Sequence, residues 1–187
     1  MKRCWSRKHL APRKFDRQAC QQRRNPLLHG IADGFLLVQP AAAQVMRETR
    51  DSAIAALKEE PRLAALRRSL DVYYGDSVRD AAMDELYGRF IRSGDLAFDI
   101  GSHVGDRIAS FRRLGARVVA LEPQADCACV IRAIHGSDRR VTLIEAACGA
   151  REGLLTLQVN SANPTVTTAS SAFVRAAAGA RGWEGQS

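Results

Sequence analysis

The stretch GDLAFDIGSHVGDRIASFRRLGARVVALEPQ, residues 94–124, decides the fold. Its apolar run at 96–100 is typical of a strand, and a helix is predicted over 105–114 after two glycines four residues apart. Gly115 marks the end of that helix, because glycine is common just beyond a helix C-terminus. The β-branched run at 117–121 then predicts a second strand, buried on both faces of a parallel sheet.

The alternation of strands and helices continues downstream. A helix is predicted over 125–134, a third strand over 141–146 and a fourth over 154–159. This β-α-β-α-β order predicts an α/β protein with a Rossmann-like, doubly wound parallel sheet, because crossovers between parallel strands are right-handed. The segment after residue 160 is small and polar, and we expect a loop with one weak helix there.

Helices are predicted ahead of the first strand. One covers residues 42–60, and Pro61 breaks it and can open the next. A third helix carries an apolar stripe at positions i, i+3, i+4 and i+7. This stripe consists of Met83, Leu86, Tyr87 and Phe90.

Positive charge is concentrated at the N-terminus. The formal net charge is +8, and residues 1–30 alone carry nine Lys or Arg against one Asp. The rest of the chain is neutral, so a nucleic-acid partner is not favoured, although the tail could contact nucleic acid or an anionic membrane. We therefore divide the chain into a basic, disordered tail at 1–40, a helical lead-in at 41–94 and a partial Rossmann-like domain at 95–187.

The five cysteines and four histidines show no C-x-x-C spacing and no clustering. This pattern favours neither a zinc site nor a disulfide framework, and no metal is expected. Unpaired cysteines fit a reducing compartment, so the expected location is the cytoplasm. The apolar stretch at 26–45 is too interrupted for a membrane span.

Two acids and two glycines stand where ligands bind in such a sheet, beyond the carboxyl ends of the strands. Asp99 and Gly101 end the first strand, and Gly105 opens the following helix. Backbone amides from Ser102 onward can accept a carboxylate or a phosphate. Glu122 ends the second strand, 21 residues after Gly101, where a carboxylate can take both hydroxyls of a ribose.

Two ligands compete for this site. A dinucleotide requires G-x-G-x-x-G, but His103 stands where the middle glycine belongs. The motif present, D-x-G-x-x-x-G, suits a ligand with an amino-acid end, since Asp99 can favour an ammonium while helix amides meet a carboxylate. S-adenosyl-L-methionine has this end and also a ribose for Glu122. The pattern therefore favours S-adenosyl-L-methionine, and an NAD-dependent oxidoreductase is the alternative.

Residues 63–172 resemble the FkbM-type methyltransferases. The resemblance is densest in residues 94–124 and continues through VTLIEAACGAREGLLTLQV and NPTVTTASSAFV. It implies a class I methyltransferase fold and methyl transfer from S-adenosyl-L-methionine to a hydroxyl of a small molecule or sugar. The cofactor-binding residues that it implies are Asp99, Gly101, Ser102, His103, Val104 and Gly105 for the methionine part, Glu122 and Pro123 for the ribose, and Glu145 and Ala146 near the adenine.

The resemblance leaves part of the family's pattern unmatched. In the family a further strand with an Ile-Asp-Val-Glu-Gly-like end follows, and the sheet is completed to seven strands. We therefore expect an incomplete domain, inactive alone, whose first strand is an exposed edge that can self-associate. No catalytic residue is assigned, and a non-catalytic remnant or interaction module is the alternative.

Several polar residues have a structural interpretation beside the functional one. His103 is more simply a loop residue placed by its backbone than a base. Tyr73 and Tyr74 fit packing of the lead-in helix as well as a substrate pocket. The polar residues after residue 160 fit a solvated loop as well as an acceptor site. These are Asn163, Thr165, Thr167 and Thr168.

Overall fold

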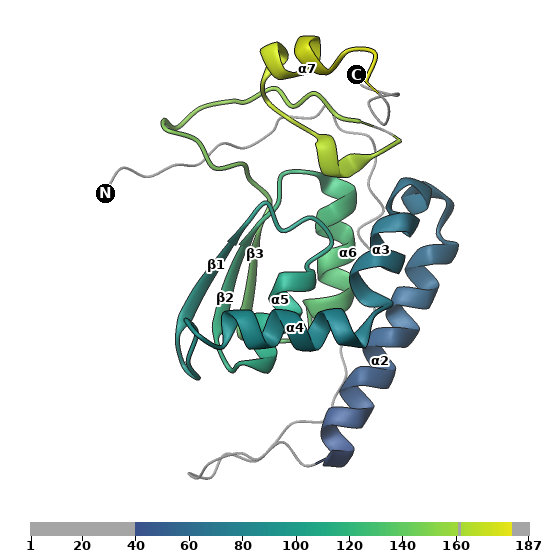
Figure 1. The fold of residues 1–187 in the computed structure, drawn as a ribbon, viewed down its shortest axis with the longest axis vertical. Helices are drawn as coiled ribbons and strands as arrows, with labels where there is room; N and C mark the ends of the chain where they lie inside the picture. The colour runs from purple at the N-terminus through teal and green to yellow at the C-terminus, as the bar shows by residue number, and fades with distance from the viewer. Residues whose placement is uncertain (1–39, 161, 181–187) are drawn as a thin grey trace.

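The structure is a computed structural model that describes residues 40–160 and 162–180, with side chains from residue 48 onward. Its centre is a parallel sheet in the order β1-β2-β3 (Figure 1). The strands are β1 Leu96–Ile100, β2 Arg117–Leu121 and β3 Val141–Ile144. The predicted α/β class with parallel strands is therefore confirmed. The prediction of a disordered tail falls on residues 1–39, outside the described ones.

Both crossover helices lie on one face of this sheet. They are α5 Asp106–Arg113, between β1 and β2, and α6 Ala125–His135, between β2 and β3. Consecutive right-handed crossovers between adjacent strands place their helices on the same side, and Figure 1 shows the helices of the body to the right of the sheet. A second helical layer, which a doubly wound sheet requires, is not found among residues 40–160 and 162–180.

The opposite face of the sheet is apolar and open. On β1 the side chains alternate, so that Leu96, Phe98 and Ile100 point away from the helices. Phe98 and Ile100 are 59% and 60% exposed. In the described structure β1 has a strand neighbour on one side alone, β2, so its other edge presents free backbone groups.

Helices precede the sheet, as predicted. They are α2 Pro40–Glu59, the 3₁₀ helix η1 Pro61–Leu66, α3 Arg67–Tyr74 and α4 Ser77–Tyr87. Pro61 opens η1 directly after α2 ends, because proline lacks the amide that would continue α2. The side chain of Asp76 accepts hydrogen bonds from the amides of Val78 and Arg79, and so caps α4.

The lead-in helices share a hydrophobic core with the sheet domain. Leu63, Leu66 and Leu70 from η1 and α3 pack with Val104 of the β1–α5 loop and Val130 of α6. All five are almost fully buried. Burial of such side chains contributes roughly 1.5–3 kcal/mol each. The lead-in helices therefore pack against the β1–α5 loop and fix its position.

The apolar stripe predicted for α4 is wrong in part. Leu86 is 50% exposed and Phe90, which lies beyond the end of the helix, is 75% exposed. Tyr87 of the stripe does pack inward, with its ring 4.9 Å from that of Phe111. Helical spacing places residues on a common face but does not say which face packs inward.

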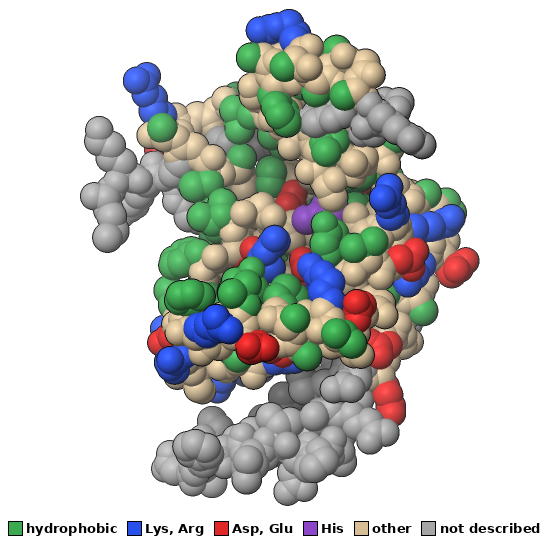
Figure 2. All heavy atoms as spheres, in the orientation of Figure 1, with side chains coloured by type: hydrophobic (Ala, Val, Ile, Leu, Met, Phe, Trp, Pro, Cys, Tyr) green, Lys and Arg blue, Asp and Glu red, His purple; other side chains and the backbone are tan. Residues whose placement is uncertain are grey.

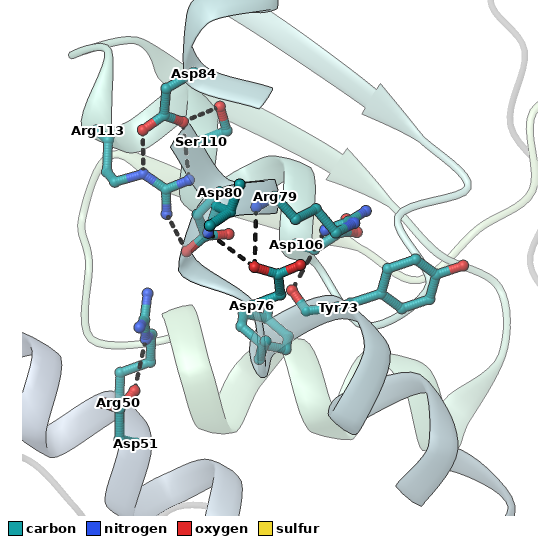
Figure 3. Close-up of polar contacts among 12 residues, drawn as sticks. Arg50, Asp51, Tyr73, Asp76, Arg79, Asp80, Asp84, Asp106, Ser110 and Arg113 are labelled. Carbon is teal, nitrogen blue, oxygen red and sulfur yellow. Dashed lines mark hydrogen bonds and ion pairs between the residues drawn. The ribbon is translucent and has the colours of Figure 1, made fainter. Parts of the chain in front are cut away.

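Polar pairs fix α4 on α5 instead (Figure 3). Nε of Arg113 lies 2.6 Å from the Asp84 carboxylate, and its Nη1 lies 3.4 Å from Asp80. The hydroxyl of Ser110 donates a further hydrogen bond to Asp84. These pairs bind the face of α4 that carries Asp80 and Asp84, which turns Leu86 toward solvent.

The fourth strand predicted over 154–159 is not formed. Leu154 is 73% exposed, and Gln158 makes an isolated antiparallel bridge with Thr168. The described chain from residue 154 onward folds back over the carboxyl end of the sheet (Figure 1). It includes η2 Pro164–Val166 and α7 Ser171–Ala177. The weak helix predicted there is confirmed. An apolar run becomes a strand only if it pairs with an accessible sheet edge. Residues 154–159 instead pair with Thr168 through Gln158.

Candidate functional site

A cavity of about 280 Å³ lies at the carboxyl ends of β1 and β2. Its walls come from the β1–α5 loop (Gly101, His103), the start of α5 (Asp106, Arg107), the residues after β2 (Glu122, Pro123, Gln124), Tyr73 of α3, and the C-terminal segment (Leu157, Pro164, Thr165, Thr167). Figure 2 shows acidic, basic and histidine side chains gathered at a hollow beneath that C-terminal segment. Parallel sheets bind ligands at this end.

Glycine at two positions lets the β1–α5 loop turn sharply. Gly101 and Gly105 have φ of 78° and 84°, a left-handed conformation that strains any other residue except asparagine or aspartate in some turns. At Gly105 a Cβ would also lie 3.2 Å from the ring of His135. The amides of Gly101 and Ser102 both donate to the carbonyl of Leu121, which folds the loop over the end of β2.

Glu122 connects the loops that follow β1 and β2. Its side chain is 2% exposed. Oε2 accepts a 2.8 Å hydrogen bond from the amide of His103, and Oε1 accepts one of 2.8 Å from the amide of Gln124. Burial raises the pKa of Glu122, and these two amide hydrogen bonds oppose the rise. Each oxygen keeps a second lone pair that a ligand hydroxyl could use.

Asp99 carries an unsatisfied acceptor. The residue is 5% exposed, and within the described part of the chain its Oδ2 atom is buried without a hydrogen-bond partner. Burial raises the pKa of the Asp99 carboxyl. A buried acceptor without a partner is destabilising, and a bound ligand group is one of the causes that explain such an atom in a native protein. A cationic or hydrogen-bond-donating ligand group beside Gly101 would satisfy it.

The imidazole of His103 is engaged by the surrounding helices. Its Nε2 lies 2.8 Å from the hydroxyl of Ser69, and its Nδ1 lies 3.5 Å from the sulfur of Cys127. Tyr73 packs edge-on against the ring, with centroids 5.9 Å apart. Burial lowers the pKa of His103, so the neutral ring is favoured. Because Ser69 and Cys127 are buried, this cluster positions the loop and does not present a nucleophile.

A second polar cluster anchors the end of the same loop. The hydroxyl of Tyr74 donates to the carbonyl of Val104 over 2.8 Å. Nε2 of His135 lies 3.0 Å from the carbonyl of Gly105 and 3.2 Å from the Tyr74 hydroxyl. Burial lowers the pKa of His135 to about 4. Tyr74 therefore packs against the β1–α5 loop and holds its end in place.

The acidic start of α5 is paired with a lead-in arginine. Asp106 is 3% exposed, and its Oδ2 lies 2.7 Å from Nη2 of Arg79 (Figure 3). The Arg79 guanidinium also lies over the ring of Tyr73, 4.8 Å from its centroid. Tyr73 and Asp106 line the cavity, and Arg79 holds them in place by charge and by cation–π contact.

Gln124 attaches the C-terminal segment to the sheet. Its Nε2 donates to the carbonyl of Pro164 over 3.1 Å, and its Oε1 accepts from the hydroxyl of Thr167 over 2.9 Å. The buried side chain of Asn160 accepts from the amides of Ala162 and Asn163, which shapes the segment from within. These bonds place Thr165 and Thr167 over the cavity.

The structure brings some of the sequence-predicted site residues to the cavity and leaves others outside its lining. Those in the lining are Gly101, His103, Glu122 and Pro123. Asp99, Ser102, Val104 and Gly105 are buried and are not in the lining, although Asp99 lies two residues before Gly101, which is. Glu145 forms an ion pair with Arg132 of α6, and Ala146 is buried, so neither lines the cavity.

Sequence reasoning missed Asp106, Arg107 and Gln124 as lining residues. Asp106 and Arg107 directly follow the glycine motif, so their position at the start of a helix was a usable signal. Gln124 carries no local signal, because its partners lie 40 and 43 residues away. Such contacts depend on tertiary packing.

Comparison with known proteins assigns no family to this chain. No family model matches the chain, and no curated protein matches it. No helix in the described ranges is both long and apolar enough to cross a membrane. A group of three or more potential metal ligands is likewise not found in that part of the chain. The chain is thus defined as an α/β protein with a polar cavity at the carboxyl edge of a parallel sheet.

Proposed function

We propose that the cavity binds S-adenosyl-L-methionine and that the chain is a methyltransferase acting on a hydroxyl of a small molecule or sugar. The observation that carries this proposal is the buried, unpartnered Oδ2 of Asp99 beside the glycine loop. The α-ammonium of the ligand would satisfy this atom. A ligand end without a hydrogen-bond donor would leave it unsatisfied, at a cost of roughly 1–3 kcal/mol.

Glu122 supports the same ligand. It lines the cavity from the strand next to that of Asp99, with Asp99 paired to Ala120 in the sheet register. A carboxylate at this place suits the two hydroxyls of a ribose. The ligand would thus present its amino-acid end toward β1 and its nucleoside toward β2.

The bound ligand would supply an activated methyl group on its sulfonium. The residues of this chain would hold it: Asp99 orients the ammonium, Glu122 orients the ribose, and the segment fixed by Gln124 limits access of water. Transfer also requires an acceptor oxygen aligned with the methyl group. Within the described residues we assign no base for the acceptor proton.

Isothermal titration tests the proposal. The full chain is titrated with S-adenosylhomocysteine and, separately, with NAD. We expect binding of the adenosylhomocysteine and none of NAD, since His103 replaces the glycine that a pyrophosphate needs. Tighter binding of NAD would overturn the proposal in favour of an oxidoreductase, and binding of neither would favour a non-catalytic interaction module.

Variants of two aspartates sharpen this test. Asp99→Asn keeps the size of the side chain and removes its charge, and we expect affinity for S-adenosylhomocysteine to fall by about tenfold or more. Asp51→Asn is the control for the loss of one charge, because Asp51 is exposed on α2, pairs with Arg50 and is not part of the glycine loop. Equal affinities in the two variants would remove the support from Asp99.

The cytoplasmic location of the protein stays a prediction.

A further inference from the structure

The start of α5 is poorly suited to receive a ligand carboxylate. Helix N-termini attract anions through their partial positive charge. Here that position already holds the buried carboxylate of Asp106, paired with Arg79. A second carboxylate at the same place would face the charge of Asp106, and like charges in a partly buried site repel strongly.

Four amides of the β1–α5 loop are also committed. Gly101 and Ser102 donate to the carbonyl of Leu121, His103 donates to Glu122, and Gly105 donates to the carbonyl of Ser102. The sequence alone suggested that amides of this loop would meet the carboxylate of the ligand. These four amides instead hold the loop together, and a guanidinium, which can pair with both carboxylate oxygens, is a stronger partner than the amides that remain.

Arg107 is such a partner. It lines the cavity one residue after Asp106 and is exposed. Its Nε donates to the hydroxyl of Tyr87 over 3.2 Å, which fixes the guanidinium on one side. Among residues 48–160 and 162–180, no carboxylate lies within 4.0 Å of its nitrogen atoms, whereas Arg79 and Arg113 of the same region are both paired. Its two terminal nitrogens are therefore available.

We propose that Arg107 binds the carboxylate of the ligand's amino-acid end, while Asp99 takes its ammonium. This inference rests on the proposed function and assigns the charge selectivity of the cavity to two side chains. A guanidinium presents two parallel N–H groups that match a carboxylate, and such bidentate pairs are stronger than neutral hydrogen bonds. The cavity then discriminates between ligands with a zwitterionic end and the same nucleosides without it.

Two ligands that differ in this end provide the test. S-adenosylhomocysteine has the amino-acid end, and 5′-methylthioadenosine has the same thioether and nucleoside without it. In Arg107→Gln we expect affinity for the first to fall by about tenfold or more. Affinity for the second is expected to stay within about twofold, because no contact with the nucleoside is removed. Arg107→Lys should recover part of the loss, since a lysine keeps the charge without the planar fork.

Arg89→Gln serves as the control variant. Arg89 is exposed, pairs with Glu85 and does not line the cavity, so both affinities should match those of the unchanged chain. Equal losses for both ligands in Arg107→Gln would show a structural role and overturn the inference, as would no loss for either. If the unchanged chain binds neither ligand, the proposed function fails and the inference fails with it. If it binds both and Arg107→Gln has no effect, the inference alone fails.

Discussion

The backbone amide of His103 donates a 2.8 Å hydrogen bond to the carboxylate of Glu122, which joins the loops after β1 and β2. The other oxygen of this carboxylate accepts from the amide of Gln124. One buried side chain therefore fixes both loops that line the cavity. This explains why a carboxylate is buried at the end of a strand, where its desolvation is costly.

Replacement of Glu122 by Gln should destabilise the fold. A glutamine has one acceptor oxygen, so its amide nitrogen would face one of the two donating backbone amides. The free energy of unfolding is expected to fall by about 1–3 kcal/mol, as for a buried hydrogen bond left unmade. Urea denaturation measures it, with Glu85→Gln as the control because Glu85 is largely exposed. Equal stability of the two variants would contradict the role of Glu122.

Asp99→Asn should separate stability from binding. Because burial raises the pKa of Asp99 in the folded state, its ionised form is destabilising there. The contribution of this group to the free energy of unfolding therefore falls as pH rises through its raised pKa. At neutral pH the asparagine variant should be at least as stable as the unchanged chain while it binds S-adenosylhomocysteine more weakly. Parallel thermal unfolding and calorimetry measure both, and a loss of stability together with binding would contradict this prediction.

His135 should make stability depend on pH below neutrality. Its folded pKa is about 4, below the value near 6.5 of an unfolded histidine. The unfolded chain therefore binds the proton first, and stability is lost as pH falls from about 6.5 to about 4, by roughly 1.4 kcal/mol for each pKa unit.

The variant His135→Gln isolates this contribution. Glutamine can still donate to the carbonyl of Gly105 but does not titrate. Urea denaturation at several pH values should show a shallower slope between pH 4 and 6.5 in this variant than in the unchanged chain. The difference between the two chains removes the effect of other groups with shifted pKa values, such as Asp99 and Glu122. Parallel slopes would count against a buried, neutral His135.

Gln124→Ala should release the segment that covers the cavity. It removes the hydrogen bonds to Pro164 and Thr167 but leaves the sheet intact. Each such bond contributes about 0.5–1.5 kcal/mol, so local opening should become roughly tenfold more frequent. Hydrogen exchange of residues 162–168 reports this opening, and amides of β2 provide the internal control. Unchanged exchange in that segment would show that other contacts hold it.

The open edge and face of β1 should cause self-association. Phe98 and Ile100 are exposed on an apolar face, and β1 has no neighbour on its outer side within the described sheet. Light scattering of the full chain should show association that Phe98→Ser reduces. Phe173→Ser is the matched control, because Phe173 is 50% exposed but belongs to α7 and not to the sheet. A chain that stays monomeric would contradict this prediction.

The sequence by itself determined the alternation of strands and helices from 96 to 144 and the turns at Gly101 and Gly105. These features follow from local periodicity and from backbone conformations that few residues besides glycine adopt readily. It also placed Asp99 and Glu122 at adjacent strand ends, because parallel strands that follow one another tend to pair.

Only the tertiary structure decided which groups meet. It turned Leu86 outward, held 154–159 away from the sheet edge, and placed Glu145 beside Arg132 instead of in the cavity. It also paired Arg79 with Asp106 and left Arg107 without an ion-pair partner among the described residues. Periodicity reports the shape of a segment, whereas the partner of a charge depends on chain folding over tens of residues. For that reason the residues predicted from the sequence include Gly101 and Glu122 of the cavity lining but not Arg107 or Gln124.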